Sequence, residues 1–213
     1  MKRILVIGAS GGIGAALCSV AGGEVVGLSR SGDGLDVTDP ASVERVLGSV
    51  EGPFDVIWIA VGILSAGQGP EKSLSQIDAQ EMADVMAVNS IGVALVMRHV
   101  PRLLASGGRV GGLSARVGSI GDNGLGGWHA YRASKAAVNQ IIRGASIELK
   151  RTHKGSVVLA LHPGTVETEF TAGYKASKLS PEESATKLTA VLEGATPDQT
   201  GQFYDYAGKA IPW

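Results

Sequence analysis

The feature that most constrains the fold is a regular alternation of short apolar runs with longer segments of helical periodicity. Each run is rich in β-branched residues and is bounded by Gly, Pro or polar residues, as in buried strands. The runs are Arg3–Ile7, Glu24–Leu28, Phe54–Ile59, Arg109–Leu113 and Ser156–Leu161, and the helical segments are Gly12–Val20, Pro40–Val50, Gln76–Leu104, His129–Arg151 and Pro181–Leu192. This alternation predicts a doubly wound α/β fold in which helices cover both faces of a mostly parallel sheet.

The length of 213 residues predicts a single domain, residues 1–213, because no repeat or low-complexity linker divides the chain. Two stretches without periodicity, residues 62–75 and 168–180, are expected to form substrate loops at the surface of that domain.

Charge and composition exclude several classes of partner. The formal net charge is −1, and 19 Lys and Arg are scattered among 20 Asp and Glu, so no basic stripe is available for nucleic acid. No apolar segment is long enough to cross a bilayer, and the start of the chain is too broken for a signal peptide. The single Cys18 forms no internal disulfide. We therefore expect a cytoplasmic protein with no nucleic-acid partner, no membrane partner and no metal site.

A glycine-rich turn follows the first apolar run and leads directly into a helix: Gly8-Ala9-Ser10-Gly11-Gly12-Ile13-Gly14. Glycines allow the backbone to turn sharply there and to approach a pyrophosphate at the positive end of the helix. The turn therefore predicts a dinucleotide site that includes Gly8, Ser10, Gly12, Ile13 and Gly14. A glycine-rich run alone is a weak signal, and its position between strand and helix strengthens it.

Ser29-Arg30, at the end of the second run, occupies the place where such units recognise the ribose. An arginine there suits a 2′-phosphate, so the sequence favours NADP(H) over NAD(H). Arg30 is otherwise an ordinary solvated cation, and the nearby Asp33 and Asp36 are able to reverse the preference. Asp36-Val37 is expected to end a short third strand and to contact the adenine.

Tyr131 and Lys135 are four residues apart in a helical segment, which places both side chains on one face. A nearby ammonium lowers the pKa of a phenol and makes it a usable proton donor to a carbonyl oxygen. Such a pair arises often by chance, but it gains weight beside a site for a hydride carrier.

These motifs together resemble the short-chain dehydrogenases/reductases, and the resemblance covers essentially the whole chain. It rests on Gly8-x-x-x-Gly12-x-Gly14, Asn89-x-x-Gly92, Tyr131-x-x-x-Lys135 and Pro163-Gly164-Thr165-Val166-x-Thr168. Within the family the sequence is similar to the carbonyl-reductase-like branch that includes the C-factor signalling proteins. The resemblance implies a Rossmann fold with a seven-stranded sheet, in which the helix between the second and third strands is truncated here.

The resemblance also implies the roles of individual residues. Tyr131 would be the acid–base, Lys135 would lower its pKa and hold the nicotinamide ribose, and Asn89 would anchor a water that relays protons to Lys135. The further cofactor contacts that it implies are made by Ala60, Val61, Gly62, Pro163, Gly164, Val166 and Thr168, in addition to Asn89, Tyr131 and Lys135.

Two local departures from the family pattern bear on the site. Ile59-Ala60-Val61-Gly62 replaces the usual asparagine-rich loop, and Ala115 stands where the family has its catalytic serine. That serine stabilises charge on the carbonyl oxygen. Three possibilities remain open: Ser114 is re-aimed by a twist or bulge and is the catalytic serine, Ser119 substitutes, or Tyr131 acts alone.

The sequence thus predicts an NADP(H)-dependent oxidoreductase acting on a small carbonyl or secondary alcohol substrate. The alternative is a dinucleotide-binding signalling or regulatory protein with little catalysis. By family analogy we expect a homodimer or homotetramer, formed through the helical segments Gln76–Leu104 and His129–Arg151. Trp128, Phe170 and Tyr174 would make the substrate site tolerant of apolar or aromatic groups, or would only fill space.

Overall fold

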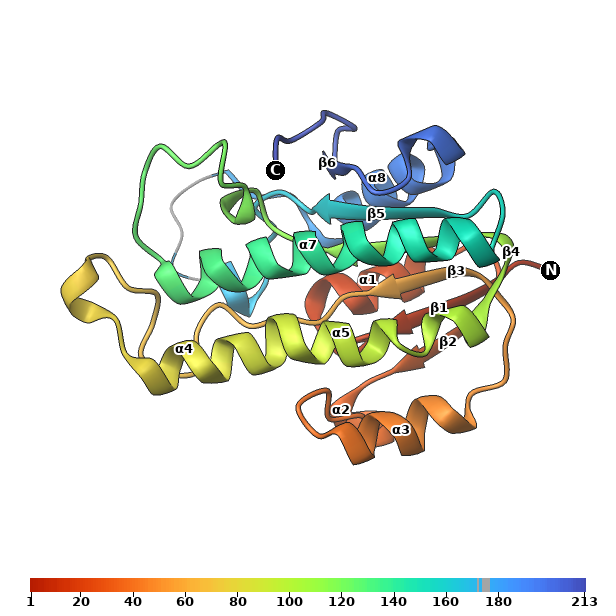
Figure 1. Ribbon diagram of the computed structural model, residues 1–213, viewed down its shortest axis with the longest axis horizontal. Helices are drawn as coiled ribbons and strands as arrows, with labels where there is room; N and C mark the ends of the chain where they lie inside the picture. Colours follow the sequence, from red (N-terminus) through yellow and green to blue (C-terminus); the bar gives the residue numbers. More distant parts are fainter. Residues whose placement is uncertain (172, 174–176) are drawn as a thin grey trace.

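The apolar runs form a parallel sheet, and the helical segments lie on both of its faces (Figure 1). The structure is a computed structural model that describes residues 1–171, 173 and 177–213. The strands are β1 (Arg3–Ile7), β2 (Glu24–Leu28), β3 (Phe54–Ile59), β4 (Leu104–Leu113), β5 (Val157–His162) and β6 (Phe203–Asp205). The helices are α1 (Gly12–Val20), α2 (Arg30–Asp33), α3 (Pro40–Ser49), α4 (Ala79–Met86), α5 (Gly92–Met97), α6 (Val100–Leu103), α7 (His129–Thr152) and α8 (Pro181–Gly194).

The strand order is β2-β1-β3-β4-β5-β6, and every neighbouring pair is parallel. The chain passes from β1 outward to β2 and then returns to the other side of β1 with β3. In an open α/β sheet this reversal opens a crevice at the carboxyl ends of the two central strands, where ligands bind. The glycine-rich turn after β1 and the loop after β3 both lie at this reversal point.

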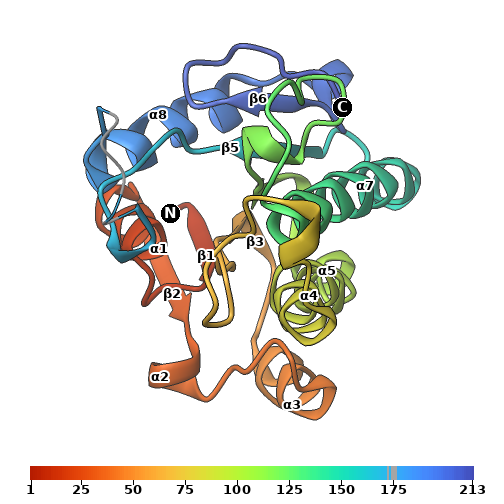
Figure 2. The ribbon, with the colours of Figure 1, turned by 90° about the vertical axis from the view of Figure 1, so that its left-hand side faces the viewer.

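Helices cover both faces of the sheet (Figure 2), and a hydrophobic core lies on each face. Successive strand residues alternate between the faces, so Leu5 and Ile7 pack toward α3, α5 and α7, whereas Ile4 and Val6 pack toward α1 and α8. The central strands β1 and β3 are therefore apolar from Ile4 to Ile7 and from Val56 to Ile59, which is why these parts of the sequence read as continuous runs.

The expected seven-stranded sheet is wrong: six strands make up the sheet in the described part of the chain. The short third strand expected to end at Asp36-Val37 is a coil, and β2 becomes the edge strand. A parallel neighbour for β2 would need a crossover of about a dozen residues or more, and only residues 29–33 separate β2 from Gly34. The expected truncation of the helix after β2 is confirmed, since α2 spans four residues.

The predicted helix Gln76–Leu104 is interrupted in the structure. Asp78 caps the start of α4 by accepting a hydrogen bond from the Glu81 amide. Residues Ala87–Ile91 then form a π-helical turn, α5 ends at Met97, and α6 begins at Val100 with Pro101 in its first turn. Such π turns often mark functional sites.

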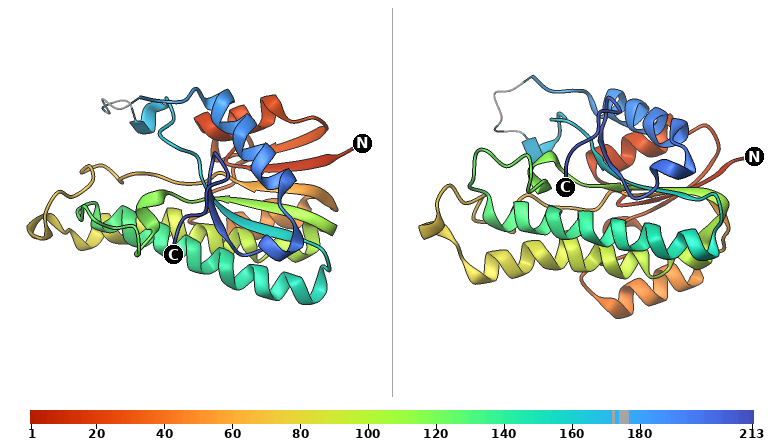
Figure 3. Two further views of the ribbon diagram at one scale, coloured as in Figure 1. Left: turned by 90° about the horizontal axis from the view of Figure 1, so that it is seen from above. Right: turned by 45° about the horizontal axis from the view of Figure 1, so that its top comes forward.

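The loops that follow the strands gather at one end of the molecule, at the left in Figure 1 and at the left of both views in Figure 3. Residues 62–78, 119–128 and 163–171 all lie there, so the described residues 62–75 and 168–171 of the two expected substrate loops lie at the carboxyl ends of the strands. Among the described helices, none is long and apolar enough to cross a membrane.

Candidate active site

The glycine-rich turn forms a cradle at the start of α1. Gly8 has φ +90°, which favours glycine, and a Cβ on Gly14 would lie 2.1 Å from the Gly8 carbonyl oxygen. No side chain caps α1 at Gly11, so its first amide groups remain available to an anion. Ser10 and Gly12 are exposed in this turn and Ile13 is half-buried. The turn therefore fits the pyrophosphate of a dinucleotide.

Two other loops lie against this turn. A Cβ on Gly8 would lie 2.5 Å from the Ala60 carbonyl oxygen, so β1 and the loop after β3 meet at the reversal point. A Cβ on Gly12 would lie 2.5 Å from Thr168 Cγ2, so the segment after β5 covers the turn. Two loops distant in sequence, after β3 and after β5, thus lie against the cradle.

The segment from Pro163 to Thr168 is fixed by contacts with its surroundings. The Pro163 carbonyl accepts a hydrogen bond from Ser184 at 2.8 Å, and Gly164 has φ +83°. Val166 is buried and forms a β-bridge with Leu179. These contacts hold Thr168 over the start of α1.

At the end of β2, Arg30 is exposed and no hydrogen bond or ion pair of the described residues uses its guanidinium. The two acids near it already accept bonds: Asp33 from the Ser29 amide, and Asp36 from the Thr38 amide and hydroxyl. The bonds from Thr38 lower the pKa of Asp36, and the charge of Arg30 contributes.

Val37 is buried, and its expected contact with the adenine stays a prediction. A Cβ on Gly92 would lie 2.8 Å from Val37 Cγ2, so this side chain packs against α5. The glycine of the Asn89-x-x-Gly92 motif therefore makes room for the coil that replaces the third strand.

Tyr131 and Lys135 lie one turn apart on α7, and both are buried. Lys135 Nζ is 5.9 Å from the centroid of the Tyr131 ring and donates a hydrogen bond to the Leu113 carbonyl at 3.1 Å. Burial lowers the pKa of Lys135 to about 8, so the ammonium still predominates at pH 7. The geometry places a cation beside the phenol.

Asn89 lies in the π-helical turn, and its side chain is fully buried. Its Nδ2 donates to the Ile63 carbonyl at 2.8 Å and to Ser134 Oγ at 2.9 Å, and its Oδ1 accepts from the Ile63 amide at 2.7 Å. A Cβ on Gly62 would lie 3.0 Å from Lys135 Nζ and 3.3 Å from Asn89 Oδ1. Asn89 therefore braces the loop after β3, with Val61 and Gly62, beside Lys135.

The two candidate serines use their hydroxyl hydrogens elsewhere. Ser114 Oγ donates to Asn139 Oδ1 at 2.5 Å, two turns of α7 beyond Tyr131, and Ser119 Oγ donates to the Pro212 carbonyl. A serine has one O–H donor, so neither hydroxyl is directed at a carbonyl bound beside Tyr131 in this arrangement. Ala115 is buried, two residues after the end of β4.

Aromatic rings surround the tyrosine. Trp128 and Phe170 both make edge-to-face contacts with the Tyr131 ring, with centroids 6.4 and 5.7 Å away. Tyr174, the third aromatic residue expected near the substrate, lies outside the described residues.

Two buried glutamates in this region were not found by sequence reasoning. Glu81 accepts hydrogen bonds from the amides of Ala66 and Gln68, and Glu71 accepts one from the Ala130 amide. Asp78-x-x-Glu81 reads as a helix start, which conceals the second role of Glu81, and no local pattern distinguishes Glu71. Both carboxylates hold the loop of residues 62–75.

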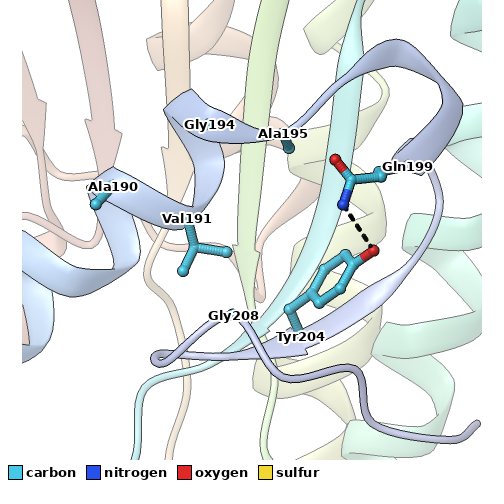
Figure 4. A pocket seen from close by; sticks show the side chains of 7 residues that line it. All are labelled: Ala190, Val191, Gly194, Ala195, Gln199, Tyr204 and Gly208. Carbon is cyan, nitrogen blue, oxygen red and sulfur yellow. Dashed lines mark hydrogen bonds between the residues drawn. The ribbon is translucent and has the colours of Figure 1, made fainter.

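A pocket of about 210 Å³ lies apart from these residues, between α8 and β6 (Figure 4). Gln199 Nε2 donates to Tyr204 Oη at 3.1 Å in its wall. Its lining residues are Ala190, Val191, Gly194, Ala195, Gln199, Tyr204 and Gly208. None of them is a predicted site residue, so this pocket is not part of the candidate active site.

Comparison with known proteins identifies the family. Residues 27–205 match a family model described as enoyl-(acyl carrier protein) reductase. The C-signal protein of Myxococcus xanthus is 34% identical over 164 residues, which cover 76% of this chain and 94% of that protein. The chain belongs to the short-chain dehydrogenase/reductase family, as its motifs predicted.

Solved structures agree with this assignment. A short-chain dehydrogenase/reductase of Burkholderia multivorans with bound NADP is 26% identical, with a TM-score of 0.85 and 100% and 99% of the two chains covered. A carbonyl reductase of Pseudomonas aeruginosa PAO1 in complex with NADP is also 26% identical, with a TM-score of 0.78 and both chains covered in full.

Proposed function

We propose that this protein is an NADP(H)-dependent oxidoreductase that interconverts a carbonyl and a secondary alcohol, with Tyr131 as the acid–base. The observation that carries the proposal is the buried Lys135 ammonium beside the Tyr131 ring, at the sheet end that also holds the glycine cradle. A carbonyl reductase needs both features at one place, because hydride and proton reach the same carbonyl group.

The residues of this chain have distinct tasks in the reaction. When bound, the reduced nicotinamide supplies a hydride to the carbonyl carbon. Tyr131 donates its phenolic proton to the carbonyl oxygen, and the alcohol forms. The Lys135 ammonium stabilises the phenolate that remains. The water relay through Asn89 stays a prediction, since its side-chain amide is used by Ile63 and Ser134.

We infer that Tyr131 acts without help from Ser114 or Ser119. The support is that the single O–H of each serine is donated to another residue. Since one donor to the developing oxyanion is worth about 10²–10³ in rate, this protein should be a slow carbonyl reductase.

The preference for NADP(H) follows from the end of β2. Arg30 is exposed there and its guanidinium makes no hydrogen bond or ion pair with the described residues, while Asp33 and Asp36 already accept hydrogen bonds. An unpaired guanidinium attracts a 2′-phosphate, whereas a free 2′-hydroxyl needs an available carboxylate. The NADP complexes of the two solved relatives are consistent with this choice.

The direct test is a panel of aldehydes, ketones and quinones assayed with NADPH and with NADH. We expect turnover of at least one carbonyl, with a higher kcat/KM for NADPH. If the protein binds NADPH but reduces no member of the panel, the oxidoreductase proposal fails.

That negative result would favour a second candidate, a dinucleotide-binding signalling protein. Two observations favour it: Ala115 removes a catalytic hydroxyl, and the chain is similar to the C-signal protein. Under this hypothesis the cofactor stabilises a surface for a partner, and Tyr131→Phe leaves the signalling activity unchanged.

We also propose that the protein is a homodimer or homotetramer. Ile91, in the π-helical turn, and Ile147, on α7, are 56% and 46% exposed. Large apolar side chains on neighbouring helices are suited to a subunit interface. Sedimentation equilibrium would test the proposal, and a monomer at micromolar concentration would contradict it.

A further inference from the structure

The chain enters α7, the helix that carries Tyr131, through three consecutive residues in the left-handed conformation. Gly126 and Gly127 have φ values of +65° and +66°, and Trp128 has φ +54°. Trp128 is the one residue other than glycine with positive φ among the described residues. A bulky side chain adopts this conformation only where its surroundings enforce it.

Glu71, in the loop after β3, makes the contacts that enforce this turn. Its carbonyl accepts a hydrogen bond from the Trp128 amide at 2.5 Å. A Cβ on Gly127 would lie a tight 3.3 Å from the same oxygen, so this contact and the positive φ together favour glycine. On the other side of the turn, Arg132 Nε donates to the Gly127 carbonyl at 2.9 Å.

The carboxylate of Glu71 caps α7. Oε1 and Oε2 lie 3.1 and 3.4 Å from the Ala130 amide, in the first turn of the helix, where the peptide N–H groups lack helical partners. Glu71 is only 5% exposed, and no ion pair of the described residues includes it. A buried carboxylate without a cation is stabilised here by the amide and by the positive end of the helix.

This cap is adjacent to the proposed acid–base. Ala130 immediately precedes Tyr131, and the Trp128 indole touches the Tyr131 ring edge to face. The backbone position of Tyr131 and the position of the Trp128 indole against its ring therefore both depend on contacts with Glu71. Cofactor-binding residues of the glycine cradle are not involved.

We propose that Glu71 is a positioning residue: by capping α7 and fixing the turn at Trp128, it couples the substrate loop to the placement of Tyr131. This inference rests on the proposed function for its kinetic consequence. The structural coupling itself is independent of any turnover.

Two substitutions separate the reach of the carboxylate from its charge. Glu71→Asp keeps the charge but withdraws the oxygens by about one C–C bond, ~1.5 Å, from the Ala130 amide. Glu71→Gln keeps the reach and an acceptor oxygen but removes the charge. Glu81→Asp is the matched control, because Glu81 is another buried carboxylate that holds the same loop and makes no bond to α7.

The measurements are kcat and KM for a carbonyl, the Kd for NADPH, and hydrogen exchange of the Ala130 amide by NMR. For Glu71→Asp we expect kcat to fall about three- to tenfold and exchange to accelerate by a similar factor, as for a weakened helix cap. The Kd for NADPH should stay within about twofold, because the cradle is intact. Glu71→Gln should keep the wild-type kcat and the wild-type protection of the Ala130 amide. Glu81→Asp should also change neither quantity.

Wild-type kcat and wild-type Ala130 protection in Glu71→Asp would overturn the proposal. Loss of both in Glu71→Gln, with Glu71→Asp unaffected, would also overturn it, since charge and not capping would then matter. If the wild-type protein reduces no carbonyl, the proposed function fails, while the exchange rates still decide whether Glu71 caps α7.

Discussion

Replacing Lys135 with methionine should make the protein more stable while impairing its chemistry. Lys135 is 3% exposed, and among the described residues its Nζ donates one hydrogen bond, to the Leu113 carbonyl, and forms no ion pair. Burial without an anionic partner holds the folded-state pKa at about 8, against an ordinary value of 10.5. Methionine has a similar length and carries no charge to desolvate.

The magnitude follows from the two pKa values. Their difference, at about 1.4 kcal/mol per pH unit, corresponds to roughly 3 kcal/mol of stability lost while both states are protonated. Between pH 8 and 10.5 the unfolded chain binds more protons than the folded one, so wild-type stability rises with pH and this penalty disappears. The lost hydrogen bond costs Lys135→Met about 1 kcal/mol. The net gain at pH 7 should be about 2 kcal/mol.

Urea unfolding of the cofactor-free protein at pH 7 and pH 10 measures this difference. Lys135→Met should be the more stable protein at pH 7, and its advantage should disappear at pH 10. Lys150→Met, an exposed position on the same helix, is the control and should change stability by less than about 0.5 kcal/mol. A Lys135→Met protein that is less stable than the wild type at pH 7 would refute the reasoning.

The remaining predictions concern cofactor choice and the serine. Arg30→Ala should raise the Kd for NADPH by about 10- to 100-fold and leave that for NADH nearly unchanged, since a charged hydrogen bond is worth about 1.5–3 kcal/mol; equal losses for both would contradict the assigned role. Ser114→Ala should lower the free energy of unfolding by about 1–3 kcal/mol, because Asn139 Oδ1 loses its donor, while kcat changes less than about threefold. A fall in kcat of about 10²-fold or more would instead make Ser114 catalytic.

The sequence was most informative where one local signal determines the structure. The runs at β1, β2 and β3 have the bounds that the sequence predicts, because a polar residue, Gly or Pro immediately precedes each run. The missing third strand follows from the short connection after Ser29, although the family pattern concealed it. The family resemblance predicts the usual number of strands, but the length of the connection between two strands decides whether both can form.

The rest of the candidate site depends on contacts between distant segments. No pattern in the sequence near Asn89 predicts a π-helical turn. Glu71 and Ala130 are 59 residues apart along the chain, so no local pattern predicts their hydrogen bond. The direction of the Ser114 hydroxyl was likewise undecided, because its partner Asn139 belongs to another element. Hydrogen bonds of this kind become visible only when the loops and α7 are placed together.

The central claim is that Tyr131 transfers the proton in a reaction driven by a bound dinucleotide. Measuring turnover and NADPH affinity together for Tyr131→Phe tests it most directly, since phenylalanine removes only the hydroxyl. We predict that kcat for carbonyl reduction falls by about 10²–10⁴-fold while the Kd for NADPH stays within about threefold. Turnover at the wild-type rate in Tyr131→Phe would contradict the account.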